Sequence, residues 1–145
     1  MAKISIEEFL KKNKTVFLDT MIFIYFFEAQ KGREKELRNL FTAIESGQIA
    51  AFTSLITLTE VLVKPYKLKV FSLVDEYLRF FNEFPHLSLI SSSQEIAMRA
   101  AQLRASRNFK TPDAMQLASA LAVNARGFIT RDKQLSLKEM SFLYL

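Results

Sequence analysis

Short apolar, β-rich runs alternate along this chain with longer segments whose apolar residues recur at helical spacing. The strand-like runs are predicted at residues 15–18, 49–53, 87–90, 128–130 and 142–145. The helical segments lie between them, at residues 21–30, 34–46, 54–63, 70–84, 92–104 and 111–125. Apolar strands separated by helices are typical of a parallel sheet covered on both faces. We therefore expect an α/β fold, a three-layer α/β/α sandwich with a central, mostly parallel sheet of roughly four to five strands.

Individual residues predict where the helices begin and end. Gly47 is placed to end the second helix, because glycine adopts the backbone conformation that closes a helix. Ser54 is expected to cap the next helix, and Pro65 to kink or break it. Thr111 and Pro112 predict another helix start, with threonine at the cap and proline in the first turn.

Length and composition narrow the class of protein. A chain of 145 residues without a linker is expected to form one domain over residues 1–145. The chain has no cysteine, which excludes disulfides, thiolate catalysis and cysteine-rich metal sites. Its one histidine, His86, is expected to be a loop or packing residue, which argues against a histidine-based triad or zinc site. No glycine-rich phosphate loop is present.

The apolar segments are too short for a membrane protein. The longest run, Met21 to Phe27, is far below the roughly 20 residues that span a bilayer. The first residues contain no continuous apolar stretch like that of a signal peptide. We expect a soluble, cytoplasmic protein with no membrane association. The aromatic stretch from Phe23 to Phe27 is expected to be mostly core, with partner binding as the alternative.

The positive charge is concentrated in the last third of the chain. The net charge is +5, and residues 99–145 carry eight basic and three acidic residues. Residues 1–98 are balanced, with twelve of each sign. On charge alone an ordinary basic surface that aids solubility is the favoured interpretation, and a polyanionic partner such as RNA is the alternative hypothesis.

Four acidic residues occupy positions where the surrounding sequence is apolar. Asp19 directly follows the first strand, Glu60 interrupts an apolar helix, Asp113 opens a helix, and Asp132 follows the fourth strand. Each has a simpler interpretation. Asp19 could cap a helix, and Glu60 could pair with Lys64 one helical turn away. Asp113 could be a first-turn acid that interacts with the positive end of the helix dipole, and Asp132 could be a turn residue.

The fold brings these acids to one place, because strand ends and the following helix starts share one edge of a parallel sheet. Two carboxylates about 4 Å apart repel by about 4 kcal/mol at an effective dielectric near 20. A divalent cation relieves that repulsion, and Mg²⁺ or Mn²⁺ prefers oxygen ligands. Such an ion can also activate water and stabilise charge on a phosphate. The acids therefore predict a metal-dependent nuclease site.

Four motifs in order resemble those of the PIN domain family, and of its VapC-like toxins in particular. They are Val16-Phe17-Leu18-Asp19-Thr20, Thr59-Glu60-Val61, Thr111-Pro112-Asp113-Ala114 followed by Leu117, Ala118 and Ala120, and Ile129-Thr130-Arg131-Asp132. The resemblance covers nearly the whole chain. Two positions depart from it: Met21 stands where many members carry a small polar residue, and Arg131 where asparagine is usual.

The resemblance implies cleavage of single-stranded RNA with Mg²⁺ or Mn²⁺. Asp19 and Asp113 would be the main metal ligands, and Glu60 and Asp132 would complete the acidic set. Thr130 would orient a carboxylate or phosphate. Arg131 would contact RNA phosphate or an antitoxin acid, with a solvated surface side chain as the alternative. The candidate substrate-binding residues are Thr20, Thr130 and Arg131.

VapC-like proteins pair with an antitoxin and often form homodimers, so both are expected here. One alternative function is a catalytically silent PIN-like module that binds RNA or protein, but it would have no need of all four acids. A receiver domain or a phosphatase of the haloacid dehalogenase type would need further acids beside Asp19, and Asp19-Thr20-Met21 does not supply them.

Overall fold

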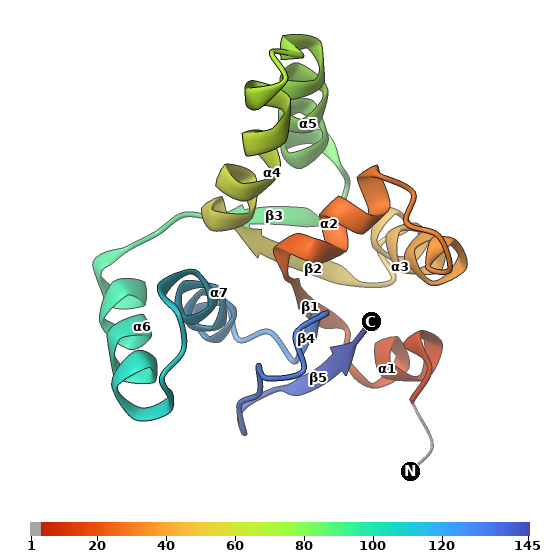
Figure 1. Cartoon of the computed structure of the whole chain (residues 1–145). Helices are drawn as coiled ribbons and strands as arrows, with labels where there is room; N and C mark the ends of the chain where they lie inside the picture. The colour runs from red at the N-terminus through yellow and green to blue at the C-terminus, as the bar shows by residue number, and fades with distance from the viewer. Residues whose placement is uncertain (1–3) are drawn as a thin grey trace.

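Five parallel strands form the centre of the computed structural model, which describes residues 4–145 (Figure 1). The strands are β1 (Thr15–Leu18), β2 (Ala50–Ser54), β3 (Leu87–Ile90), β4 (Gly127–Thr130) and β5 (Ser141–Tyr144). Their order across the sheet is β3-β2-β1-β4-β5, and every neighbouring pair is parallel. In the central register, Phe17 of β1 lies opposite Phe52 of β2 and Phe128 of β4.

Helices cover both faces of this sheet. They are α1 (Ile6–Lys12), α2 (Thr20–Phe27), α3 (Glu34–Glu45), α4 (Leu55–Lys67), α5 (Phe71–Glu83), α6 (Gln94–Arg107) and α7 (Thr111–Ala122). Figure 1 shows α6 and α7 together on one side of the sheet, with α1 and α3 on the other. The predicted three-layer α/β/α architecture is thereby confirmed. In residues 4–145 no helix combines the length and apolarity that crossing a bilayer requires.

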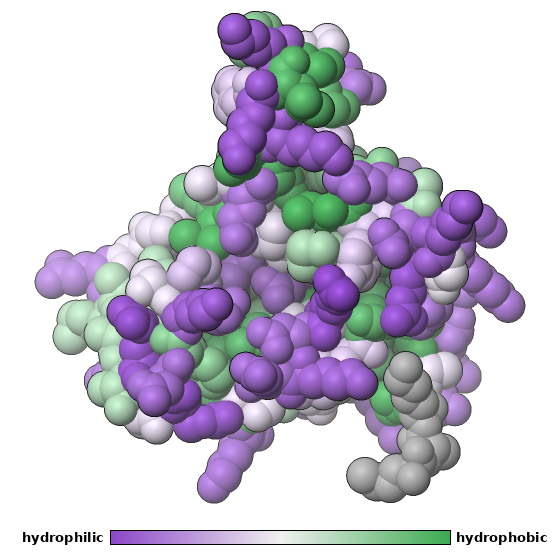
Figure 2. Space-filling view, viewed as in Figure 1, coloured by the Kyte–Doolittle hydropathy of each residue, from purple (hydrophilic) through white to green (hydrophobic). Residues whose placement is uncertain are grey.

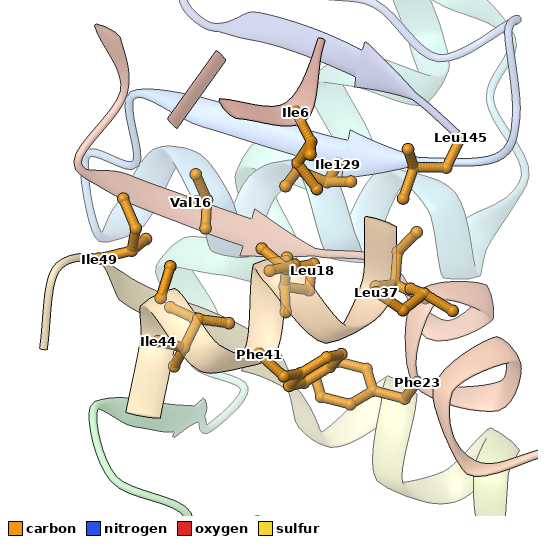
Figure 3. Packing of buried hydrophobic residues seen from close by; sticks show 14 of the residues in the cluster. Ile6, Val16, Leu18, Phe23, Leu37, Phe41, Ile44, Ile49, Ile129 and Leu145 are labelled. Atoms are coloured by element: carbon orange, nitrogen blue, oxygen red, sulfur yellow. The ribbon is translucent and has the colours of Figure 1, made fainter. Parts of the chain in front are cut away.

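Each face of the sheet has its own apolar core. On one face, helices α1 to α3 pack on Val16, Leu18 and Ile129 (Figure 3). Phe23 of α2 is fully buried there, with its ring centroid 4.9 Å from that of Phe81 and 5.8 Å from that of Phe41. On the other face, helices α6 and α7 pack on the side chains of Phe17 and Phe128, whose rings stack. The expectation that Phe23 to Phe27 is mostly core is confirmed: Phe23 and Tyr25 are buried, and Phe26 and Phe27 are partly buried.

Helices α4 and α5 form a hairpin that projects from the sheet (Figure 1). Apolar side chains are exposed around the turn of the hairpin, namely Tyr66, Leu68, Val70 and Phe71. Figure 2 shows a patch of apolar surface at this tip, beside hydrophilic side chains.

The helices α4 and α7 differ from expectation at one position each. Helix α4 runs through Pro65 without breaking, because proline removes only the bond its own nitrogen would donate, and Leu68 N still bonds Lys64 O at 3.0 Å. Lys110, one residue before the predicted Thr111, is the cap position of α7 and makes no side-chain capping bond.

Helix α1 was not expected from the sequence. Its start is marked by Ser5, whose hydroxyl accepts a hydrogen bond from Glu8 N at 3.2 Å. This serine, followed three residues later by glutamate, is a helix-start pattern that an amphipathic segment of only seven residues made easy to miss.

Candidate active site

The carboxyl ends of β1 and β4 lie where the order of the sheet reverses direction. From β1 the chain passes to β2 and β3 on one side, and then returns to β4 and β5 on the other. Asp19 directly follows β1, and Asp132 follows β4 by two residues. Open parallel sheets hold their ligands at such a reversal point, because the connecting segments diverge there and leave a crevice.

An open cavity of about 640 Å³ occupies this edge of the sheet. All four predicted acids line it, from four separate stretches of the chain: Asp19, Glu60, Asp113 and Asp132. Its other lining residues are Thr20, Met21, Ile24, Arg131 and Lys133. Asp19 and Asp113 are partly buried, whereas Glu60 and Asp132 are exposed. The structure therefore brings together side chains that lie up to 113 positions apart in sequence.

A second, larger hollow of about 860 Å³ lies among Ser93, Arg126 and Ser141, and it contains none of the predicted site residues. Arg126 precedes β4 and Ser141 begins β5, so this hollow lies at the amino ends of the strands. Size alone does not make it the better candidate, because parallel sheets place their sites at the opposite edge.

Asp19 is held in a fixed orientation by hydrogen bonds to both of its carboxylate oxygens. Its Oδ1 accepts from the backbone N–H of Thr20 at 2.9 Å, so it also caps α2. Its Oδ2 accepts from the hydroxyl of Thr130 at 2.7 Å. Thr130 is fully buried, and its hydroxyl accepts from the N–H of Asp132 at 3.0 Å. Thr130 was expected to orient either a carboxylate or a phosphate, and its hydrogen bond to Asp19 fits the first of these roles.

Glu60 does not pair with Lys64, which was the simpler interpretation of its position. Its Oε1 accepts a hydrogen bond from the Thr20 hydroxyl at 2.7 Å, and Lys64 instead lies 3.4 Å from Glu28. Because α4 packs against α2, the side chain of Glu60 reaches Thr20 and lines the cavity. Asp132 also lines the cavity, and its Oδ1 accepts from Gln134 N at 2.9 Å, as expected of a turn residue.

The electrostatics of the cavity disfavour the charged form of two acids. Burial raises the pKa of Asp113, and the nearby charges of Asp19, Asp132 and Glu60 raise it further. Burial also raises the pKa of Asp19, with a smaller contribution from the charge of Asp132, and its hydrogen bonds offset only part of this rise. Without a cation, the cavity therefore disfavours ionisation of both carboxyl groups.

This repulsion predicts an unusual stability effect in metal-free protein. A carboxyl group whose pKa is raised by folding stabilises the fold at low pH and loses that contribution as pH rises through its folded pKa. At pH 7 to 8 and with chelator present, Asp113→Asn is therefore expected to melt no lower than wild type, and up to roughly 4 °C higher. The difference should shrink as pH is lowered toward the range where Asp113 takes up a proton. Thermal melts at a series of pH values measure it, and a large loss of stability at neutral pH would make Asp113 a structural helix cap instead.

The donor set of the cavity fits a hard divalent cation. Among residues 4–145, no group of three or more His, Asp or Glu side chains is arranged as a cage that could hold a metal ion. Mg²⁺ does not need such a cage, because it keeps several waters and is usually bound through one or two carboxylates. Asp19 and Asp113 would be the residues to supply these carboxylates, and Glu60 and Asp132 would reach the ion directly or through water.

Two basic side chains lie at the rim of the acidic cavity. Arg131 and Lys133 flank Asp132 in sequence, and all three line the cavity. The guanidinium of Arg131 lies over the ring of Tyr25, 5.8 Å from its centroid. This stacking holds an exposed arginine at the rim, where it can meet an anion entering the cavity.

Two buried polar residues beneath the cavity were not identified from the sequence. Gln116 lies on α7, three residues after Asp113, and Thr57 lies on α4, three residues before Glu60. Both are fully buried and hydrogen-bonded to each other at 2.8 Å. The sequence offered one indication of this contact, a single glutamine on the apolar face of a helix. A buried polar side chain at such a position requires a hydrogen-bond partner.

Comparison with known proteins decides the family. The PIN domain family model matches residues 16–143, which include all four acids. The chain belongs to the PIN domain family. PIN domains are generally nucleases. No curated protein sequence matches the chain.

Solved structures of similar fold include a toxin–antitoxin complex, VapBC2 and FitAcB. A toxin–antitoxin complex from Klebsiella pneumoniae contains a chain with 28% sequence identity and a TM-score of 0.64, covering 86% of this PIN domain protein and 94% of that chain. VapBC2 from Rickettsia felis, bound to a fragment of promoter DNA, gives 19% identity and a TM-score of 0.68 over 88% of this chain and 96% of that chain. FitAcB from Neisseria gonorrhoeae gives 17% identity and a TM-score of 0.66 over the same shares.

Proposed function

We propose that this PIN domain protein is a metal-dependent endoribonuclease that cleaves single-stranded RNA as the toxin of a VapBC-type toxin–antitoxin pair. The observation that carries the proposal is the gathering of Asp19, Glu60, Asp113 and Asp132 around one cavity rimmed by Arg131 and Lys133. An acidic cavity repels a phosphodiester unless a cation occupies it. The combination of four acids and a basic rim is suited to a phosphodiester bound through a metal ion.

Each residue has a role in this proposal. Asp19 and Asp113 hold the Mg²⁺ or Mn²⁺ ion, and Glu60 and Asp132 complete the acidic set. When bound, the ion supplies an activated water and stabilises negative charge on the phosphate. Thr130 and the Thr20 N–H keep the Asp19 carboxylate oriented, while the Thr20 hydroxyl holds Glu60 at the cavity. Arg131 binds the phosphate backbone at the rim.

A protein antitoxin and a second copy of the chain are the proposed partners. The Klebsiella pneumoniae structure is a toxin–antitoxin complex, and its matched chain is similar to this one over most of both lengths. The exposed apolar residues on the α4–α5 hairpin support a protein–protein interaction, because exposed apolar patches often mark such interfaces. The chain is co-expressed with any small DNA-binding protein encoded directly upstream of its gene, and the molar mass of the purified complex is measured. This experiment tests both the antitoxin partner and the homodimer.

The activity is tested with purified protein and a single-stranded RNA labelled at one end. Cleavage is expected with Mn²⁺ or Mg²⁺ and is expected to stop with excess EDTA. A double-stranded RNA of the same sequence serves as the control for strand selectivity. RNA that is bound but never cut, whatever the metal, would favour the silent binding module instead.

Binding of RNA should weaken as salt rises. The slope of the logarithm of affinity against the logarithm of salt concentration is expected to be about 0.7 per phosphate contact, and Arg131→Gln should lower it by roughly one contact. The binding assay is run with Ca²⁺ in place of Mn²⁺ to suppress cleavage, and Arg79→Gln on α5, which does not line the cavity, is the matched control. Affinity that does not depend on salt would argue against the basic rim as the RNA-binding surface.

A further inference from the structure

A buried row of hydroxyl groups lies beneath the cavity and connects Glu60 with the end of β1. The Thr20 hydroxyl oxygen is 2.7 Å from Glu60 Oε1 and 3.1 Å from the Thr57 hydroxyl oxygen. The Thr57 oxygen is in turn 2.7 Å from that of Thr53, which lies 2.8 Å from the carbonyl oxygen of Leu18. The row thus links a helix of the projecting hairpin to the strand that carries Asp19.

This row has more contacts than protons. The Leu18 carbonyl and an ionised Glu60 can only accept hydrogen bonds, and each threonine hydroxyl has one proton to donate. Three hydroxyl protons therefore serve four oxygen–oxygen contacts, so one contact brings lone pairs together. The longest of the four is the 3.1 Å contact between Thr20 and Thr57.

The side-chain amide of Gln116 supplies the missing donor at that contact. Its Nε2 lies 2.8 Å from the Thr57 oxygen and 3.3 Å from the Thr20 oxygen, and it also lies 3.5 Å from Asp19 Oδ1. The other end of the amide fixes its orientation, because the Ser54 hydroxyl donates to Oε1. A flipped amide would turn its oxygen toward the Asp19 carboxylate, which is unfavourable.

The amide joins three elements that carry acids. Gln116 is on α7 one turn after Asp113, Thr57 is on α4 one turn before Glu60, and Thr20 begins α2 directly after Asp19. Gln116 and Thr57 are 1% and 0% exposed, so water does not compete for these bonds. Hydrogen bonds in such an environment restrict the groups that they connect more strongly than bonds in water do.

We propose that Gln116 and Thr57 are positioning residues, which set the spacing of Asp19 and Glu60 that a divalent cation requires. The inference rests on the proposed metal-dependent function and adds to it two residues that do not themselves face the cavity. If their role were only structural, their loss would lower stability and leave the affinity for metal unchanged.

Two substitutions of Thr57 separate these roles. Thr57→Val keeps the shape and removes the hydroxyl, whereas Thr57→Ser keeps the hydroxyl and removes a methyl group. Electron paramagnetic resonance measures Mn²⁺ affinity directly, because free Mn²⁺ gives a sharp signal that is lost on binding. Thr57→Val is expected to bind Mn²⁺ roughly 10- to 100-fold more weakly than wild type, the usual effect of losing a residue that supports a metal ligand. Thr57→Ser should recover most of the affinity.

Matched variants complete the experiment. Ser119→Ala removes another buried hydroxyl from α7, one that donates only to Met115 O at 2.7 Å, and should leave Mn²⁺ affinity unchanged. Gln116→Met keeps the length of the side chain without its amide, and it should repeat the loss seen with Thr57→Val. It also decides the question should Thr57→Val fail to fold. In metal-free wild type, nuclear magnetic resonance should find the Gln116 amide protons slow to exchange with water, and Thr57→Val should speed that exchange.

The outcomes distinguish the two proposals. If wild type binds Mn²⁺ and cleaves RNA while Gln116→Met and Thr57→Val bind Mn²⁺ equally well, the positioning role is wrong and the nuclease function stands. Equal weakening by Thr57→Ser and Thr57→Val would likewise assign Thr57 to packing. A wild-type protein that binds no Mn²⁺ would overturn both.

Discussion

Asp113→Asn is expected to lower Mn²⁺-dependent RNA cleavage by roughly 1000-fold, a loss equivalent to about 4 kcal/mol of transition-state stabilisation. Asparagine keeps the size of the side chain and removes the charge that attracts a cation. Asp113 lies in the first turn of α7 and makes no described side-chain hydrogen bond, so the substitution breaks no contact that holds the fold together. The rate of cleavage of an end-labelled RNA at saturating Mn²⁺ measures the effect.

Asp19→Asn should produce a similar loss, but its interpretation needs more care. The Asp19 side chain also caps α2 and accepts the Thr130 hydroxyl, so part of any loss could come from a shift of these groups. Asp75→Asn provides the matched control, because Asp75 is exposed on α5 and does not line the cavity. Equal cleavage by wild type, Asp113→Asn and Asp19→Asn would point to a contaminating nuclease or a different site.

The largest loss of stability is expected from Phe23→Ala. Phe23 is 0% exposed and packs against the rings of Phe27, Phe41, Phe80 and Phe81. Removing such a ring typically costs about 3–5 kcal/mol, because contacts are lost and the cavity left behind closes only partly. For a domain of this size the melting temperature should fall by roughly 6–20 °C.

Phe71→Ala is the control for this loss. Phe71 begins α5, and 59% of its surface is exposed, so the same substitution should change the melting temperature by no more than roughly 2 °C. A comparable fall in the melting temperature of both variants would mean that the aromatic cluster around Phe23 does not limit the stability of the fold. Because α2 begins at Thr20, the cluster also fixes the element that follows Asp19.

The positions of Asp19 and Asp132 could be predicted because they depend on local pattern. An acid that comes one or two residues after a short apolar strand must lie near the end of that strand, and parallel pairing then places the ends of β1 and β4 side by side. The five strands were likewise predictable, to within one residue at every end, since each is a short apolar run.

The partners of Glu60 could not be predicted in the same way. Lys64 is one helical turn away and is the natural partner in an isolated helix, but it pairs with Glu28, and Glu60 meets Thr20. That choice depends on how α4 is rotated against α2, which is set by packing between segments that lie far apart in sequence. The contacts of Gln116 escaped prediction for the same reason, because its partners Thr20 and Thr57 lie 96 and 59 positions away.

Direct measurement of Mn²⁺ binding by electron paramagnetic resonance, on wild type, Asp19→Asn, Asp113→Asn and the control Asp75→Asn, tests the account most directly, since it requires neither RNA nor turnover. We predict that wild type and Asp75→Asn bind the ion with equal affinity and that each of the other two variants binds it at least roughly tenfold more weakly. Unchanged affinity in both Asp19→Asn and Asp113→Asn would show that these two carboxylates do not share a cation, and would contradict the proposed active site.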